Sequence, residues 1–150
     1  MGKKQITEEN QEDAIKENKA VEAAVSKETK VKVSQRFYEG KVYVSSSYNN
    51  TIITLTSMQG QVLGWKSAGS VGFKGAKKAT SFAASRVAES IANICKKIGV
   101  EKVSVLISGI GSGRESSVRT LVNQGINVVS IKDITPVPHN GCRPRKVRRV

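Results

Sequence analysis

Residues 79–109 read ATSFAASRVAESIANICKKIGVEKVSVLISG, and their hydrophobic pattern changes from helical spacing to a short apolar run. Thr80 or Ser81 can cap a helix that ends at Gly99, and VSVLISG at 103–109 has the length of a buried strand. The apolar residues at helical spacing are Ala84, Val87, Ala88, Ile91, Cys95 and Ile98. This stretch therefore predicts a helix that packs on a sheet and leads into the next strand, which is a crossover unit of an α/β fold.

The segments on either side extend this pattern. KVYVSSS (41–47), NTIITLTSM (50–58) and QVLGWKSA (61–68) are rich in β-branched and aromatic residues and are separated by turn signals. They predict a meander of three antiparallel strands. ESSVRTLVNQG (115–125) predicts a shorter helix, and INVVSIKDI (126–134) predicts a last strand. The order βββαβαβ predicts an α/β fold in which helices pack on a mixed sheet.

The two ends of the chain differ from this central part. Residues 1–35 are rich in charged and amide side chains and poor in large apolar ones, which predicts a flexible charged extension. Residues 36–135 form the predicted globular domain. Residues 136–150 form a basic tail that holds all three prolines and no acid. Such a tail cannot bury itself in a core, so we expect a partner to order it.

Charge is distributed unevenly along the chain. The net charge is +13, but residues 1–30 carry six lysines against seven acids, which leaves 19 basic and 5 acidic side chains in residues 31–150. A domain so basic repels itself unless a polyanion neutralises it, so we expect a nucleic-acid partner. A membrane is not expected, because no run approaches ~18 apolar residues. Without a secretory signal, the two cysteines are expected to be reduced thiols, in the cytoplasm or in an organelle matrix or stroma.

The loop GSVGFKGAKKATS (69–81) points to phosphate binding. Lys74, Lys77 and Lys78 lie just before or at the start of the long helix, where the helix dipole already favours acids over cations. A bound phosphate would resolve this conflict, because both the dipole and the lysines attract it. The alternative is a mobile, solvated loop, and we favour the phosphate site.

The loop ISGIGSGRES (107–116) leaves two interpretations open. It is either a tight crossover turn or a second phosphate cradle in which Arg114 supplies a guanidinium fork. Its G-x-G-x-G spacing differs from the dinucleotide pattern G-x-G-x-x-G, and Gly113 is followed by Arg114 rather than by the Lys of a P-loop. As evidence for a nucleotide cofactor the motif is weak.

Catalytic and metal sites find little support in the sequence. The five acids after residue 31 are too few and too scattered for metal-assisted cleavage of a phosphodiester. His139 is the single histidine, and with Cys142 it supplies two ligands where a closed zinc site needs four. We therefore expect no enzyme activity, no metal and no cofactor.

A few further side chains could contact RNA bases. Tyr48, Trp65 and Phe73 could stack on bases, although Trp65 fits a core position equally well. Asn49 and Asn50 lie at a predicted turn, where asparagine is common, and their amides could also bind bases or phosphates.

Taken together, four motifs resemble a known family. SYNNTIITLT, GWKSAGSVGFKGAKKATSFAA, GIGSGRES and TPVPHNGCRPRKVRRV are similar in sequence and order to the eleventh universal family of small-subunit ribosomal proteins, in its bacterial or organellar form. The resemblance covers about residues 41–150 and leaves the extension at 1–35 unmatched. Ile110, Ser112 and Arg145 stand where bacterial members commonly have proline.

The resemblance implies a ribonuclease-H-like sheet without the nuclease's acids. It also implies binding to 16S-type rRNA on the platform of the small subunit (30S), near the mRNA exit path, the exit-site tRNA and neighbouring platform proteins. A ribonuclease-H-like hydrolase and a nucleotide-binding protein using Gly109–Gly113 are the alternatives. The candidate rRNA-binding residues are Asn49, Asn50, Lys66, Lys74, Lys77, Lys78, Arg114, His139, Asn140, Arg143, Arg145, Lys146, Arg148 and Arg149.

Overall fold

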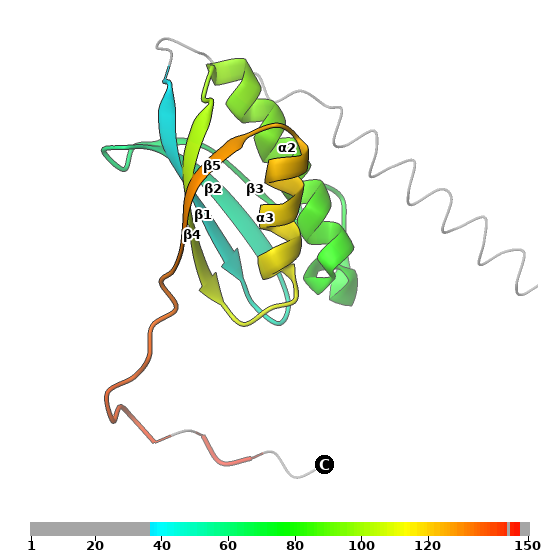
Figure 1. Ribbon diagram of the computed structural model, residues 1–150. Helices are drawn as coiled ribbons and strands as arrows, with labels where there is room; N and C mark the ends of the chain where they lie inside the picture. The colour runs from blue at the N-terminus through cyan, green and yellow to red at the C-terminus, as the bar shows by residue number, and fades with distance from the viewer. Residues whose placement is uncertain (1–36, 144, 148–150) are drawn as a thin grey trace, which may run out of the picture.

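The computed structural model describes residues 37–143 and 145–147 (Figure 1). The predicted extension at 1–35 lies outside these residues, as do Arg148 and Arg149 of the tail. Within the described ranges, no helix is both long and apolar enough to cross a bilayer.

The elements follow one another in the predicted order, with one short 3₁₀ helix added. They are β1 (Glu39–Ser46), β2 (Thr51–Ser57), β3 (Val62–Ser67), the 3₁₀ helix η1 (Gly75–Ala79), α2 (Ser81–Ile98), β4 (Lys102–Gly109), α3 (Gly113–Asn123) and β5 (Asn127–Asp133). The strands form one five-stranded sheet of order β3-β2-β1-β4-β5. β1 pairs antiparallel with β2 and β2 with β3, whereas β4 pairs parallel with both β1 and β5. The predicted mixed, ribonuclease-H-like sheet is confirmed.

Both α-helices cover the same face of the sheet (Figure 1). Val42 and Val44 of β1 are fully buried, as are Ile53 and Leu55 of β2, and they alternate with partly or fully exposed neighbours up to a bulge after Leu55, where Thr56 is buried as well. Because successive side chains of a strand point to opposite faces, this alternation buries one face and leaves the other open. β4 follows the same rule, since its buried residues are Val103, Val105 and Ile107.

The long helix α2 has the caps that the sequence predicted. The Thr80 hydroxyl accepts a hydrogen bond from the Ala83 N–H at 3.2 Å, and Gly99 ends the helix in the left-handed conformation at φ 88°. All six apolar residues predicted to share a face are buried. Ala83, Ala92 and Ile94 are buried as well; Ile94 lies against Gly64 of β3, and α2 packs against α3 in addition to the sheet. Burial raises the pKa of the Cys95 thiol to about 12, so this cysteine is a core residue.

The glycines of the loop between β4 and α3 allow it to pack directly on the turn between β1 and β2. A Cβ atom on Gly111 would lie 2.4 Å from both Ser46 Oγ and Ser47 O, and one on Gly113 would lie 2.5 Å from Thr51 Oγ1. Gly109 approaches Ser46 even more closely and has a φ of 92°. Of the two interpretations of this loop, the tight crossover turn therefore accounts for the glycines without any ligand.

We predict that Gly111→Ala destabilises the fold, because the new methyl group overlaps Ser46 and Ser47. Overpacking of this kind lowers the free energy of unfolding by about 1–3 kcal/mol. Gly69→Ala is the matched control, since a Cβ there meets its nearest atoms at 3.9 Å and the backbone φ is not left-handed. Urea unfolding of the purified chain measures both variants, and equal stability of the two would contradict the packing argument.

Candidate nucleic-acid interface

Four connecting segments gather at one end of the sheet, which we call the carboxyl end. β1, β4 and β5 are parallel and finish there, and the antiparallel strand β2 begins there while β3 finishes there. The segments are the turn 47–50, the loop 68–80, the loop 110–112 and the start of the tail at 134. Gly111 N–H donates to Ser46 O at 2.9 Å, and the Ser112 hydroxyl donates to Ala79 O at 2.7 Å, so adjacent segments are directly bonded.

The predicted lysine cluster lies on the loop 68–80. Lys74 precedes η1 in an extended conformation, and Lys77 and Lys78 belong to the last turn of η1. The lysines therefore precede α2 rather than forming its first turn, and that first turn contains no acid. Lys74 and Lys77 are exposed, whereas Lys78 and Lys66 are half-buried. Aromatic packing ties the loop to α2, because the Phe73 and Phe82 rings meet edge to face with centroids 5.9 Å apart.

The turn 47–50 leaves its asparagine side chains outside the hydrogen bonds that form it. The Ser47 hydroxyl accepts from Asn50 N–H at 3.1 Å and donates to Asn50 O at 3.1 Å. Asn49 is exposed, and the Asn50 side-chain oxygen is buried without a hydrogen-bond partner among the described residues. Tyr48 is exposed at 74% beside them. The turn thus presents an amide and an aromatic ring that the fold itself does not require.

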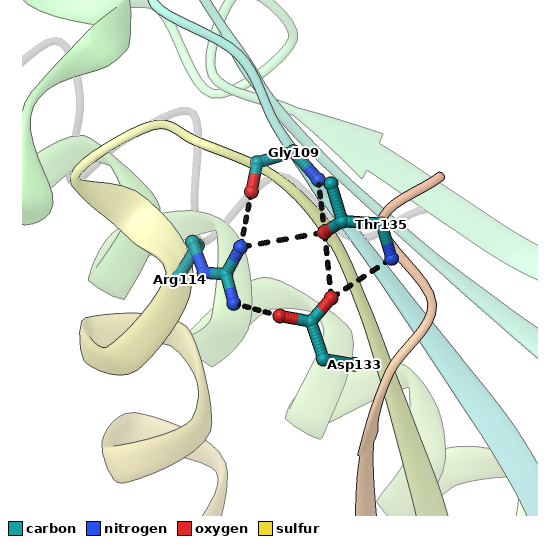
Figure 2. A network of polar contacts seen from close by, with 4 residues as sticks. All are labelled: Gly109, Arg114, Asp133 and Thr135. Carbon is teal, nitrogen blue, oxygen red and sulfur yellow. Dashed lines mark hydrogen bonds and ion pairs between the residues drawn. The ribbon is translucent and has the colours of Figure 1, made fainter. Parts of the chain in front are cut away.

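Arg114 connects α3 to the end of β5 and to Thr135, just before the tail (Figure 2). Its guanidinium donates to Gly109 O and to the Asp133 carboxylate, and more weakly to Thr135 Oγ1 at 3.4 Å. Thr135 Oγ1 also accepts from Gly109 N–H at 3.1 Å and donates to Asp133 Oδ1 at 2.6 Å. We call these four residues the Arg114 network. It fixes the direction in which the tail leaves β5.

The same network stabilises the ionised form of Asp133. Hydrogen bonds from the Thr135 hydroxyl and backbone N–H, and then from Arg114, lower the pKa of the Asp133 carboxyl from 3.8 to about 2. The network was not predicted from the sequence. The Asp-Ile-Thr spacing at 133–135, which favours a local turn, was the available signal for its Asp133–Thr135 part.

The tail beyond Thr135 is exposed over its described length. His139 is exposed, and Asn140 adopts a left-handed conformation with a φ of 56° at a bend of the chain. Arg143, Arg145 and Lys146 are also exposed. The tail starts from the carboxyl end of the sheet and extends away from the domain, so only its base lies near the loop 68–80 (Figure 1).

The carboxylates do not form a catalytic cluster in the described part of the chain. Asp133 is bound to Arg114, and Glu89 pairs with Arg86 at 3.0 Å on α2. Residues 37–143 and 145–147 contain no group of three His, Cys, Asp or Glu side chains placed to hold a metal ion. The carboxyl end of the sheet instead offers amides, exposed lysines and a basic tail, a combination suited to a phosphate backbone.

We predict that the Asp133 carboxyl titrates near pH 2 in the folded chain. Because its folded pKa lies below its ordinary value of 3.8, its contribution to stability is present above about pH 4 and is lost as the pH falls towards 2. Carbon-13 NMR titration of the carboxyl measures this directly. Arg114→Gln should raise the midpoint, and an unchanged midpoint near 3.8 in the unsubstituted chain would contradict the network.

Comparisons with known proteins match the part of the chain that carries these features. The family model for ribosomal protein S11 matches residues 40–149, from β1 to the end of the tail. The small ribosomal subunit protein uS11 of Treponema pallidum is 52% identical over 127 residues, which are 85% of this chain and 99% of that protein.

Two further relatives give the same result. The protein of the same name from Borreliella burgdorferi is 49% identical over 128 residues, covering 85% of this chain and 98% of that protein. The one from Herminiimonas arsenicoxydans is 47% identical over 132 residues, covering 88% and 98%. With a family model that spans most of the chain and relatives near half identity, the chain belongs to the ribosomal protein S11 family.

Proposed function

We propose that this chain is a structural, non-catalytic protein of the small ribosomal subunit and that it binds 16S-type rRNA through the carboxyl end of its sheet. The loop 68–80, which carries Lys74, Lys77 and Lys78, is called the lysine loop from here on. The observation that carries the proposal is that this loop, the Asn49–Asn50 turn and the base of the basic tail lie at the same end of the sheet. The relatives are named as proteins of the small ribosomal subunit, which supports the same assignment.

The mechanism is neutralisation of rRNA phosphates by cations held on a rigid support. Lys74 and Lys77 are exposed beside the N-terminus of α2, where the helix dipole adds to the attraction of an anion. The arginines of the tail can bind phosphates with two parallel hydrogen bonds. Each phosphate neutralised releases counterions, so affinity falls with salt with a log-log slope of about −0.7 to −0.9 per phosphate.

Arg114 contributes to this mechanism chiefly by holding the residues from which the tail starts. Its guanidinium already donates to Gly109, Thr135 and Asp133, and this supports a role in directing the tail towards the RNA. A direct contact of Arg114 with phosphate stays a prediction. His139, Asn140, Arg143, Arg145 and Lys146 then supply the contacts of the tail itself, together with Arg148 and Arg149 beyond the described residues.

The place of the protein within the subunit is a finer part of the proposal. The family resemblance implies the platform, beside the mRNA exit path and the exit-site tRNA, with neighbouring platform proteins as further partners. The position supports subunit assembly and translation, whether the host ribosome is bacterial or that of an organelle. The two alternative functions gain no support from the geometry. Gly109, Gly111 and Gly113 contact the chain's own atoms, which argues against a nucleotide site, and Asp133 is bound to Arg114, which argues against a hydrolase.

We predict that Lys74→Glu with Lys77→Glu weakens rRNA binding and lowers its salt dependence. The loss of two phosphate contacts should reduce the log-log salt slope by about 1.4–1.8. Lys96→Glu with Lys97→Glu is the charge-matched control, because these residues lie in the last turn of α2, away from the carboxyl end of the sheet. Filter binding to 16S-type rRNA over a salt series measures both pairs.

An equal loss of affinity and slope in the two double variants would show that only net charge matters. That result would refute the proposed interface, although it would leave RNA binding itself intact. Circular dichroism melts of both variants establish that each is folded.

A further inference from the structure

The strand register aligns five side chains across the face of the sheet that the helices leave uncovered. Trp65 of β3 is paired with Thr54 of β2, and Thr54 with Tyr43 of β1. Tyr43 is paired in turn with Leu106 of β4, and Leu106 with Lys132 of β5. Their sequence neighbours Val42, Val44, Leu55 and Val105 are buried under the helices, so this row lies on the opposite face. We call this surface the open face.

The open face carries Trp65 on its edge strand β3, Tyr43 and Leu106 nearer its centre, and hydroxyls towards the carboxyl end. Trp65 is 59% exposed and Ile52 is 38% exposed, whereas Tyr43 and Leu106 are half-buried. The next row towards the carboxyl end contains Ser67, Ile52, Ser45 and Ser108, again aligned by the register. Trp65 therefore lies on the surface and is not a core residue.

The charges of the open face are suited to a polyanion. Neither of these two rows contains a carboxylate, and Lys132 at the end of the first row is exposed. Asp133 is aligned with Ile107 and bonds to Arg114 of α3, which places its carboxylate on the helix side of the sheet. The outer part of the face adds Lys41, which is aligned with Ser104.

The open face is also continuous with the proposed rRNA interface. Ser67 ends β3 immediately before the lysine loop, and Ser108 lies two residues before Ile110 at the tip of the loop between β4 and α3. Ser45 lies two residues before the turn 47–50. An RNA strand bound at the carboxyl end can pass from these loops onto the face without leaving the protein.

We propose that the open face is a stacking platform for unpaired rRNA nucleotides, with Trp65 as the principal stacking residue. This inference rests on the proposed function and assigns a second RNA contact beyond the basic loops. Exposed aromatic rings accept bases of any sequence, and lysines at the margin of the sheet hold the phosphates. The row spans four inter-strand spacings, or about 19 Å, which is room for several nucleotides.

The single tryptophan of the chain makes the test direct. The full-length protein is titrated with single-stranded oligouridine at low salt while the emission of Trp65 is recorded. A base that stacks on the indole quenches its emission. Lys74→Glu with Lys77→Glu should shift the titration to higher oligouridine concentration but leave the quenching at saturation unchanged, because the indole still meets the base.

Substitutions then test the energetic role of the ring. Trp65→Ala should weaken binding about five- to a hundredfold by filter binding, in line with stacking on one aromatic residue. Trp65→Phe should recover most of the affinity. Tyr38→Ala is the control, since Tyr38 is an aromatic of similar exposure (55%) that precedes β1 at the opposite end of the sheet. Thermal melts of the three variants separate loss of contact from loss of fold.

Four results would overturn the inference. Saturating RNA that leaves Trp65 emission unchanged, or Trp65→Ala with full affinity, would remove the open face from the RNA interface while the basic loops keep their proposed role. Protection of Trp65 from acrylamide that appears only when other small-subunit proteins join the rRNA complex would assign the face to a protein neighbour. If filter binding shows no salt-dependent affinity for RNA at all, the proposed function fails together with the platform.

Discussion

Because β4 pairs parallel to both β1 and β5, the three strands end together, and this pairing determines where every candidate RNA contact lies. Each parallel strand must be reached by a crossover that returns the chain to the starting end of the sheet. The connections that follow β1, β3, β4 and β5 are therefore all released at the same end. Reversing any one of these strands would move one of these connecting segments to the far end of the sheet.

The part of the fold that forms the core differs from the part proposed to bind RNA. Both helices pack on one face and bury most of the large aliphatic residues, and the loop 68–80 adds only Ala68 and Val71 to this core. The other segments at the carboxyl end are held by backbone contacts, such as that of Gly111 with Ser46, and by the Arg114 network. Close glycine contacts hold the loop between β4 and α3 against Ser46 and Ser47, while Lys74 and Lys77 of the neighbouring loop stay exposed.

Local signals in the sequence were sufficient for the elements but not for their arrangement at the site. The caps Thr80 and Gly99 and the periodicity between them predicted α2, because helix boundaries depend on near neighbours. The meander and the two crossover units were predicted for the same reason. The 3₁₀ helix η1 was missed, since its five residues carry no periodic pattern.

The features of the site that were not predicted depend on contacts between segments that are distant in the sequence. The close approach of Gly111 to Ser46 and Ser47, and the bonds of Arg114 to Asp133 and Thr135, join residues that only the strand order brings together. The sequence suggested either a phosphate cradle or a turn for the glycine loop, and a phosphate-binding fork for Arg114. The exposure of Trp65 was undecidable for a similar reason, because a period of two cannot tell which face of a sheet the helices will cover.

The central claim is that RNA contacts the carboxyl end of the sheet, and ultraviolet cross-linking of native small subunits tests it most directly. Mass spectrometry of the RNA-linked peptides of this chain identifies the contacting residues. The account predicts cross-links within residues 48–50, 66–78 and 139–146. Cross-links concentrated in residues 58–61 and 97–101, at the opposite end of the sheet, would contradict it.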